Sequence, residues 1–213
     1  DNCNHYLSEE LENIKKEALK YLDLKSKLVG LRLKKYKAVV PYVNTSNSTK
    51  LIFKGKIKAV ESPGKININQ IDKSSVIDAK GCVVCPGFID MHVHFREPGF
   101  EYKETIESGC KSAAAGGFTS VAVMPNTKPV NDTRSVTELI LSQAQAKGIV
   151  NVHAIAAITQ GLAGERLSEM ADLKDAGAIA FSDDGRPVMN NELMRRAFEY
   201  SKMFKLPLIQ HSE

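Results

Sequence analysis

From residue 86 onward, hydrophobic positions follow two alternating patterns. Short runs of apolar, β-favouring residues are typical of buried strands, and all but the last are followed by a longer stretch with apolar residues at helical spacing. The pattern predicts strands at 86–94, 119–124, 151–158, 178–182 and 206–210, and helices near 103–115, 134–147, 165–176 and 190–204. Five strand–helix repeats or part-repeats of this kind predict a parallel sheet with helices on its outside.

The hydrophobic pattern before residue 86 is different, and it divides this part of the chain in two. In residues 1–35 an N-cap serine, Ser8, is followed by apolar residues at helical spacing with lysines between them, which predicts an amphipathic helix. In residues 36–85, short β-rich runs at 39–40, 51–53, 57–60 and 76–79 are separated by polar and Pro-Gly clusters. These runs predict a small antiparallel sheet with too few strands to be a complete domain. We therefore expect three segments, a helical segment at 1–35, an incomplete β subdomain at 36–85 and an α/β unit at 86–213.

The first strand of the α/β unit carries a row of polar side chains. Side chains alternate between the two faces of a strand, so Asp90, His92 and His94 share one face while apolar residues occupy the other. Two histidines at i and i+2 have Cα atoms roughly 6.5 Å apart, so both imidazoles can reach one metal ion, and Asp90 could orient one of them. The alternative is a pair of surface histidines on an edge strand. The apolar opposite face and the arginine that follows the strand, Arg96, favour a metal site.

Composition limits the class of protein. The chain has 213 residues, of which 43% are hydrophobic and 25% charged, as expected for a soluble globular chain of one or two domains. Its net charge of +4 is mild and its lysines are scattered, so we expect no nucleic-acid partner. No apolar run approaches the roughly 20 residues of a membrane span, and the N-terminus lacks the layout of a signal peptide. We therefore expect no membrane association and a cytoplasmic location.

Two cysteines, Cys82 and Cys85, have the spacing of half a zinc site or of a redox pair. A second closely spaced pair is absent from the sequence, and Cys85 directly precedes a Pro-Gly at the start of a predicted strand. We therefore expect both to be small buried apolar residues in a reducing compartment.

Polar residues follow several of the predicted strands. Besides the histidine pair, these are Asn126, Asp183, Asp184 and His211. A (β/α)8 barrel and an open doubly wound sheet both fit the alternation of strands and helices, but an open sheet would concentrate its site at one switch point. Barrel sites are built at the carboxyl ends of several strands. We therefore expect an α/β fold, a (β/α)8 TIM barrel to which residues 86–213 contribute about five strands.

Four motifs together carry a family likeness. They are Pro86-Gly87-Phe88-Ile89-Asp90-Met91-His92-Val93-His94-Phe95-Arg96-Glu97-Pro98-Gly99, Met124-Pro125-Asn126-Thr127, Phe181-Ser182-Asp183-Asp184-Gly185 and His211-Ser212-Glu213. Over about residues 50–213 the chain closely resembles the amidohydrolase superfamily and, within it, the dihydroorotases of the long, bacterial-like type. His-x-His alone would indicate the superfamily, whereas the first two motifs narrow the likeness to dihydroorotases or close cyclic-amide relatives. The family pattern continues for about as many residues again, so the resemblance implies an N-terminal half, a barrel truncated after about five strands.

The resemblance implies a role for each matching residue. His92 and His94 would hold a first zinc ion, the aspartate of the Asp-Asp-Gly turn would bridge two zinc ions, and His211 would hold the second. Arg96 and Asn126 would bind the carboxylate of the substrate, a task that suits a guanidinium fork. The proton-shuttling aspartate of the family is expected in the missing half. The implied cofactor is therefore Zn²⁺, with two ions per complete chain.

Strand alternation indicates which aspartate faces the site. In the strand before the Asp-Asp-Gly turn, the bulky Ile179 and Phe181 share a face with Asp183, whereas two small residues share a face with Asp184. Barrel strands turn their large apolar groups toward the helices, so we expect Asp184 to face the barrel axis and to be the metal ligand. The alternative is a simple polar turn, since Asp-Gly is a common turn dipeptide.

The implied function is that of a zinc-dependent cyclic amidohydrolase, most closely a dihydroorotase that interconverts N-carbamoyl-L-aspartate and L-dihydroorotate in pyrimidine biosynthesis. The strand at 178–182 has no lysine of the kind that hydantoinases and dihydropyrimidinases carboxylate as a bridging ligand, which favours the aspartate-bridged kind. The alternatives are a non-catalytic dihydroorotase-like scaffold subunit and a related cyclic amidase such as allantoinase or hydantoinase. The expected partners are a small-molecule substrate and, for the complete protein, a second copy of the chain or aspartate transcarbamoylase. The 213-residue chain by itself is expected to be inactive.

Overall fold

The computed structural model describes residues 42–44, 49–53, 56–62, 65, 76–78 and 86–211. The chain divides into two compact units, Asp1–Pro86 and Gly87–Glu213, and each is described by itself. The helix expected in residues 1–35, the strand expected at 39–40 and the Cys82–Cys85 pair lie outside the described residues.

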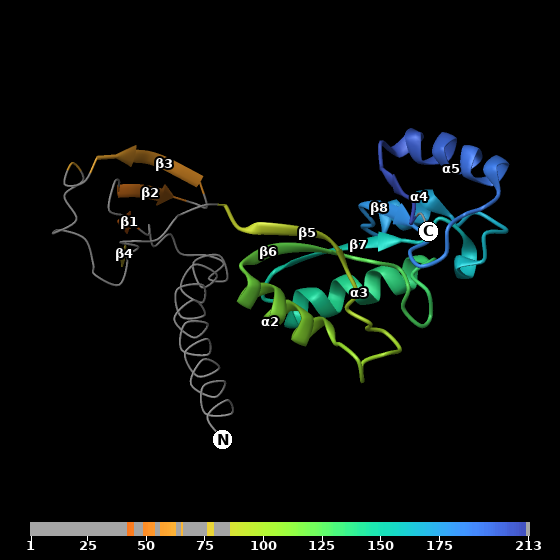
Figure 1. Cartoon of the computed structure of the whole chain (residues 1–213), viewed down its shortest axis with the longest axis horizontal. Coiled ribbons are helices and arrows are strands. Elements are labelled where there is room, and N and C mark those ends of the chain that lie inside the picture. Colours follow the sequence, from red (N-terminus) through yellow and green to blue (C-terminus); the bar gives the residue numbers. More distant parts are fainter. Residues whose placement is uncertain are drawn as a thin grey trace, which may run out of the picture. The chain divides into compact units, whose positions relative to one another are not determined.

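The first unit contains a four-stranded sheet. Its strands are β1 (Tyr42–Asn44), β2 (Thr49–Phe53), β3 (Lys56–Glu61) and β4 (Val76–Asp78), in the order β3-β2-β1-β4 (Figure 1). The β1–β2 and β2–β3 pairs are antiparallel, as expected, but β1 and β4 are parallel. The prediction of an antiparallel sheet is wrong for this pair, because the long connection between β1 and β4 lets the chain return in the same direction.

The second unit is built on a five-stranded parallel sheet. Its strands lie in chain order, β5 (Phe88–Val93), β6 (Phe118–Val123), β7 (Asn151–Ala156), β8 (Ala180–Ser182) and β9 (Leu208–Ile209). Between them lie α2 (Ile106–Gly116), α3 (Arg134–Lys147), the 3-10 helix η3 (Gln160–Leu162), α4 (Met170–Asp175) and α5 (Asn191–Phe204). Each strand pairs in parallel with the next, so the predicted strand–helix alternation is confirmed (Figure 1).

The boundaries differ most from expectation before α4. A helix is expected from about residue 165, whereas α4 begins at Met170. The residues before it form a small turn, in which Thr159 and Leu167 make an isolated antiparallel bridge and Ser168 N donates to Ile158 O. These contacts join residues several positions apart, and helical periodicity does not report them.

Apolar side chains form separate clusters on the two faces of the parallel sheet. One cluster lies against α2 and α3 and a second against α4 and α5, where Phe181 of β8 is fully buried. A third cluster, on the opposite face, consists of Ala122, Met124, Ile155 and Ala180. Phe181 therefore packs toward the helices while its neighbour Ala180 faces the other way, as strand alternation requires.

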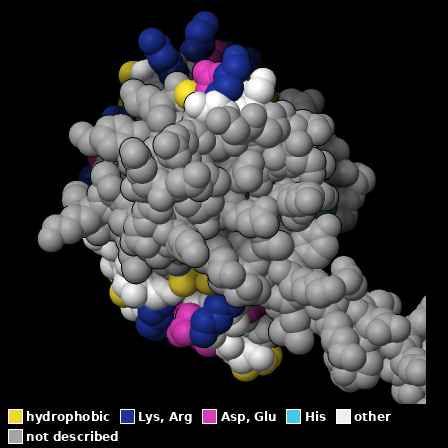
Figure 2. All heavy atoms as spheres, turned by 90° about the vertical axis from the view of Figure 1, so that its left-hand side faces the viewer, with side chains coloured by type: hydrophobic (Ala, Val, Ile, Leu, Met, Phe, Trp, Pro, Cys, Tyr) yellow, Lys and Arg dark blue, Asp and Glu magenta, His cyan; other side chains and the backbone are white. Residues whose placement is uncertain are grey.

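Several charged side chains of the described surface lie in pairs of opposite sign. On α5, Arg195 bonds Glu192 and Glu199, and Arg134 of α3 pairs with Asp172 of α4. Among the coloured side chains of Figure 2, Lys and Arg lie next to Asp and Glu. No helix within the described ranges is long and apolar enough to cross a membrane.

Candidate metal centre

Polar side chains gather where the strands of the second unit end. His92 is the penultimate residue of β5 and His94 follows that strand, while Asn126, Asp184 and His211 follow β6, β8 and β9. Because these strands are parallel, their carboxyl ends lie at one edge of the sheet. The fold therefore places residues that are far apart in the sequence within reach of one another.

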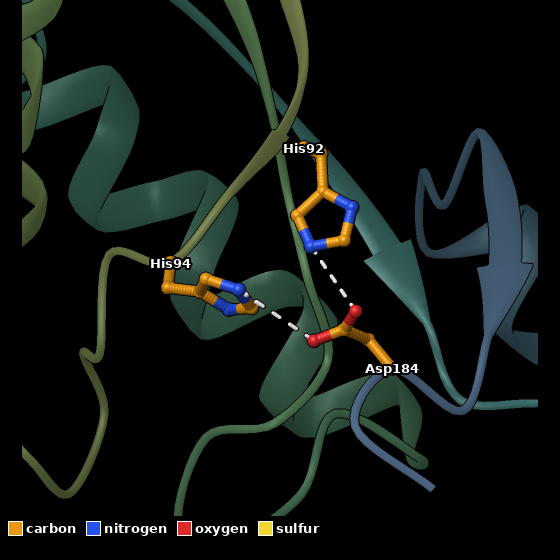
Figure 3. Close-up of side chains that lie close together, drawn as sticks. All are labelled: His92, His94 and Asp184. Atoms are coloured by element: carbon orange, nitrogen blue, oxygen red, sulfur yellow. Dashed lines mark ion pairs between the residues drawn. The ribbon is translucent and has the colours of Figure 1, made fainter. Parts of the chain in front are cut away.

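Asp184 lies at the centre of a group of histidines (Figure 3). Its Oδ1 is 3.1 Å from His92 Nε2 and 3.0 Å from His211 Nδ1, and its Oδ2 is 3.6 Å from His94 Nε2. The Asp184 side chain is 4% exposed and that of His92 is 46% exposed, so the carboxylate is buried and the imidazoles are accessible from solvent. The structure thus brings together the four side chains that the sequence analysis assigns to metal binding.

Asn126 lies between two members of this group. Its Nδ2 donates to Asp184 Oδ2 at 3.0 Å, and its Oδ1 lies 3.0 Å from His94 Nδ1. Because an amide oxygen can only accept, His94 Nδ1 is the donor of this hydrogen bond, and Nε2 is the ring nitrogen that faces Asp184. Asn126 therefore orients both the imidazole and the carboxylate.

The donor set suits a divalent metal ion such as zinc. One ligand atom from each of His92, His94 and Asp184 lies within 4.8 Å of the others. Imidazole nitrogens combined with a carboxylate oxygen are ligands that zinc binds in proteins. His94 Nε2 and Asp184 Oδ2 lie 3.6 Å apart, and both are atoms through which these side chains bind metal ions.

Asp183 points away from this group and is held by the turn after β7. Its Oδ1 accepts hydrogen bonds from Ile158 N at 2.7 Å and Thr159 N at 3.0 Å, and its Oδ2 accepts one from Thr159 Oγ1. We call these three hydrogen bonds the Asp183 clamp. Burial raises the pKa of the Asp183 carboxyl above its ordinary value, and the hydrogen bonds from Thr159 and Ile158 oppose this effect. Asp183 and Asp184 thus face opposite sides, as alternation predicts for neighbours at the end of a strand.

Arg96 lies in the turn after β5, between two anchored neighbours. Phe95 is 4% exposed and packs so closely on Gly109 of α2 that an added Cβ there would lie 2.4 Å from the ring. Glu97 Oε2 accepts a hydrogen bond of 2.8 Å from Ile106 N at the start of α2. Arg96 itself has φ of 57°, a left-handed conformation that is uncommon for non-glycine residues. Within residues 86–211 its guanidinium makes no hydrogen bond or ion pair, so the backbone is held on both sides of a side chain that can bind a ligand.

Some contacts of the site were not foreseen from the sequence. Asp90 Oδ1 accepts from the backbone N of His92 at 3.0 Å, so Asp90 contacts the main chain and not an imidazole. The bridging position of Asn126 and the partners of Asp183 were also missed. These partners lie up to 58 positions apart in the sequence, and no local pattern signals them.

Comparison with known proteins gives a consistent result for the sequence. Residues 81–213 match the family described as dihydro-orotase-like. The chain is 61% identical over 141 residues to the dihydroorotase of Solibacter usitatus. The matched stretch is 66% of this chain and 33% of that protein. It is 49% identical over 183 residues to the dihydroorotase of Syntrophus aciditrophicus. Here the matched stretch is 85% of this chain and 42% of that protein. The chain thus spans about a third to two fifths of the length of these curated relatives.

The fold is similar to that of solved hydantoinases. L-Hydantoinase (dihydropyrimidinase) from Arthrobacter aurescens matches with a TM-score of 0.63 and 21% identity, over 82% of this chain and 40% of that chain. A D-hydantoinase matches with a TM-score of 0.60 and 21% identity, over 81% of this chain and 39% of that chain. At this identity the likeness concerns the fold alone. It confirms the predicted fold class, because the five parallel strands form part of a (β/α)8 barrel.

Proposed function

The chain belongs to the dihydro-orotase-like family, and on this premise we propose that the complete protein is a zinc-dependent cyclic amidohydrolase. The activity that fits best is that of a dihydroorotase, the reversible closure of N-carbamoyl-L-aspartate to L-dihydroorotate in pyrimidine biosynthesis. The observation that carries the proposal is the buried Asp184 carboxylate with three imidazoles around it at the carboxyl edge of the sheet. Identity of 61% to a dihydroorotase favours this activity over that of a hydantoinase, to which the likeness is one of fold.

Four side chains are assigned to the metal centre in this proposal. His92 and His94 would hold a first Zn²⁺, His211 would hold a second, and Asp184 would be a ligand shared by the two. When bound, the metal ions supply an activated water and polarise the amide carbonyl of the substrate. Asn126 fixes the tautomer of His94 so that Nε2 is the ligand atom.

Arg96 and Asn126 are assigned to the carboxylate of the substrate. The Arg96 guanidinium offers two parallel N–H donors, which match the two oxygens of a carboxylate. Asn126 uses one hydrogen of its amide nitrogen for Asp184, and the second hydrogen is left for a substrate oxygen. The same side chain can therefore orient the metal ligands and contact the substrate.

The remaining assignments extend the proposal to the protein as a whole. The enzyme acts on a small molecule in the cytoplasm, with no nucleic acid or membrane as a partner. Strands β1–β4 belong to a small β subdomain and residues 86–211 to the first part of the barrel, whereas the segment 1–35 lies outside the described residues. A complex with a second copy of the chain or with aspartate transcarbamoylase is the expected assembly.

The test is to measure metal content and turnover of the complete protein together. We expect mass spectrometry of the metal to give about two Zn²⁺ per chain. We also expect hydrolysis of L-dihydroorotate, which is monitored through the decrease in its ultraviolet absorbance. His92→Asn should lower the zinc content and reduce kcat/KM by at least about 100-fold, the upper range for loss of a residue that only supports a metal ligand. His153→Asn, on β7, is the matched control and should change neither quantity.

The other candidate functions predict different outcomes of the same test. A non-catalytic scaffold would be folded and would turn over no dihydroorotate even when loaded with zinc. A hydantoinase or allantoinase would hydrolyse hydantoins or allantoin faster than L-dihydroorotate. Either outcome would refute the dihydroorotase assignment.

A further inference from the structure

Strand β8 leaves the sheet directly before the candidate metal centre. The register of β7 and β8 runs through Ile155↔Ala180 and Ala156↔Phe181 and then stops. The chain turns over residues 183–186, closed by a hydrogen bond of 2.9 Å from Arg186 N to Asp183 O, with Gly185 at φ of 80°. Asp184 occupies the corner of this turn, so the direction of its carboxylate depends on how the turn is held.

The Asp183 clamp replaces the missing backbone pairing at this point. If the register continued, Asp183 would lie beside Ile158, and it is the side chain of Asp183 that accepts from the backbone nitrogens of Ile158 and Thr159. The Asp183 side chain is fully enclosed, with 2% of the residue exposed. A buried carboxylate that accepts three hydrogen bonds is a rigid attachment, because breaking any of them leaves a buried polar group without a partner.

The hydroxyl of Thr159 ties a third segment to the clamp. Thr159 Oγ1 donates to Asp183 and accepts from Gly164 N at 3.0 Å. Its only hydrogen is used toward the carboxylate, so Asp183 must present an acceptor and not a donor at this position. The turn after β7 and the turn that carries Asp184 are thus joined through one side chain.

We propose that Asp183 is a positioning residue whose clamp directs Asp184 toward His92, His94 and His211 and so sets the affinity of the centre for Zn²⁺. This inference rests on the proposed function, because it takes these residues to be the metal ligands. Asp183 contacts neither the histidines nor the space between them, so its effect on the metal passes through the backbone of the turn. Residues that orient metal ligands in this way commonly change metal affinity by 10–100-fold when replaced.

Four variants of the complete protein test the inference. Asp183→Asn keeps the shape and one acceptor oxygen but turns a donor toward Thr159. Thr159→Val removes the hydroxyl, and Thr159→Ser keeps it. Asp132→Asn is the matched control, because Asp132 Oδ2 accepts from Gly161 N at 2.7 Å in the same turn and acts on Asp183 only through the repulsion of their charges.

The readout is the affinity of the metal-free protein for Zn²⁺, measured by competition with a chromophoric chelator, together with the visible spectrum of the Co²⁺-loaded protein. We expect Asp183→Asn to weaken Zn²⁺ binding by about 10–100-fold and to alter the Co²⁺ spectrum. Thr159→Val should have a smaller effect in the same direction, and Thr159→Ser and Asp132→Asn should stay within about twofold of the unchanged protein. Thermal unfolding of each metal-free variant is recorded separately, since a merely structural role would lower the midpoint without changing the affinity.

The Zn²⁺ affinities of these variants distinguish failure of the inference from failure of the proposed function. Zn²⁺ affinity of Asp183→Asn within about twofold of the unchanged protein would overturn the inference while leaving the proposed function intact. If Asp183→Asn does not fold, the Zn²⁺ affinities of Thr159→Val and Thr159→Ser are compared instead. Equal Zn²⁺ affinities of these two variants would overturn the inference. If the unchanged complete protein binds no Zn²⁺, the proposed function fails and this inference fails with it.

Discussion

At the scale of single residues, the candidate site is organised by one carboxylate. Asp184 is buried and within 3.6 Å of three imidazoles, while Asn126 bonds both Asp184 and His94. Removing Asp184 would therefore leave the surrounding side chains without their common partner. The substrate-binding side of the site depends instead on Arg96, whose backbone is held by its two neighbours.

The first prediction concerns Arg96→Lys in the complete protein. A lysine keeps the charge but cannot form the two parallel hydrogen bonds of a guanidinium, so transition-state binding should weaken by roughly 2–3 kcal/mol in kcat/KM. Zinc content should stay unchanged, because Arg96 contacts none of the candidate ligands. Arg166→Lys, at an exposed position in the loop before α4, is the control and should leave kcat/KM unaltered. Loss of zinc from Arg96→Lys would show that the arginine supports the fold of the site.

At the scale of elements, the packing of α2 on the end of β5 positions the residues around Arg96. Helix α2 begins at a capping box formed by Thr105 and Ser108 and ends at Gly117, which has φ of 86°. Gly109 of α2 lies directly against the ring of Phe95. The absence of a side chain at residue 109 thus lets the helix approach the strand that carries the histidines.

We predict that Gly109→Ala destabilises the complete protein. Alanine favours a helix over glycine by about 1 kcal/mol, but its Cβ would lie 2.4 Å from Phe95, and overpacking of this kind costs about 1–3 kcal/mol. The net effect should be a lower midpoint of thermal unfolding and weaker Zn²⁺ binding, since Phe95 adjoins His94. Ser112→Ala, on the exposed face of the same helix, is the control and should raise the midpoint slightly. A stabilised Gly109→Ala variant would contradict the close packing.

A second prediction for an element concerns the pH dependence of α5. Hydrogen bonds from Arg195, with smaller contributions from Arg196, hold the pKa of the Glu192 carboxyl at about 2, below its ordinary value of 4.5. A lowered pKa in the folded state means that the ion pairs stabilise the fold above about pH 4.5 and lose this effect as the pH falls toward about 2. The difference in unfolding midpoint between the unchanged protein and Glu192→Gln should therefore be small at pH 7, shrink between pH 4.5 and 2, and diminish in high salt. A difference independent of pH would show that packing, and not charge, is responsible.

At the scale of the whole molecule, the parallel sheet has two edges that pair on one side only. Within residues 86–211, β5 and β9 are the outer strands of the order β5-β6-β7-β8-β9. Apolar side chains on β5 are exposed, with Phe88 at 54%, Ile89 at 67% and Met91 at 73%. Unpaired strand edges flanked by apolar side chains are typical sites of aggregation.

We predict that residues 1–213, expressed alone, are poorly folded and inactive. The exposed edges should cause association, Zn²⁺ should bind weakly at most, and L-dihydroorotate should not be turned over. The measurements are size-exclusion chromatography with light scattering, calorimetric unfolding and the hydrolysis assay, with the complete protein as the control. A soluble monomer with a sharp unfolding transition and ring-opening activity would contradict this prediction and would define a minimal catalytic unit.

The local sequence patterns are sufficient for part of this description. The alternation of strands and helices from residue 86 onward predicts the parallel sheet, because the hydrophobic periods of strand and helix are set by the chain itself. The two-residue period of a strand also places His92 and His94 on one face and separates Asp184 from Asp183. These predictions need only neighbouring residues, and they agree with the positions of these side chains in the structure.

The tertiary structure alone decides how distant segments meet. The parallel pairing of β1 with β4, the turn before α4, the place of Asn126 between His94 and Asp184, and the clamp on Asp183 all join residues that no local pattern relates. Each arises because burial leaves a polar group in need of a partner, and the nearest partner in space is supplied by whichever segment the fold brings there. The sequence by itself thus determined which side chains face the candidate site, and the packing of the strands determined which of them touch.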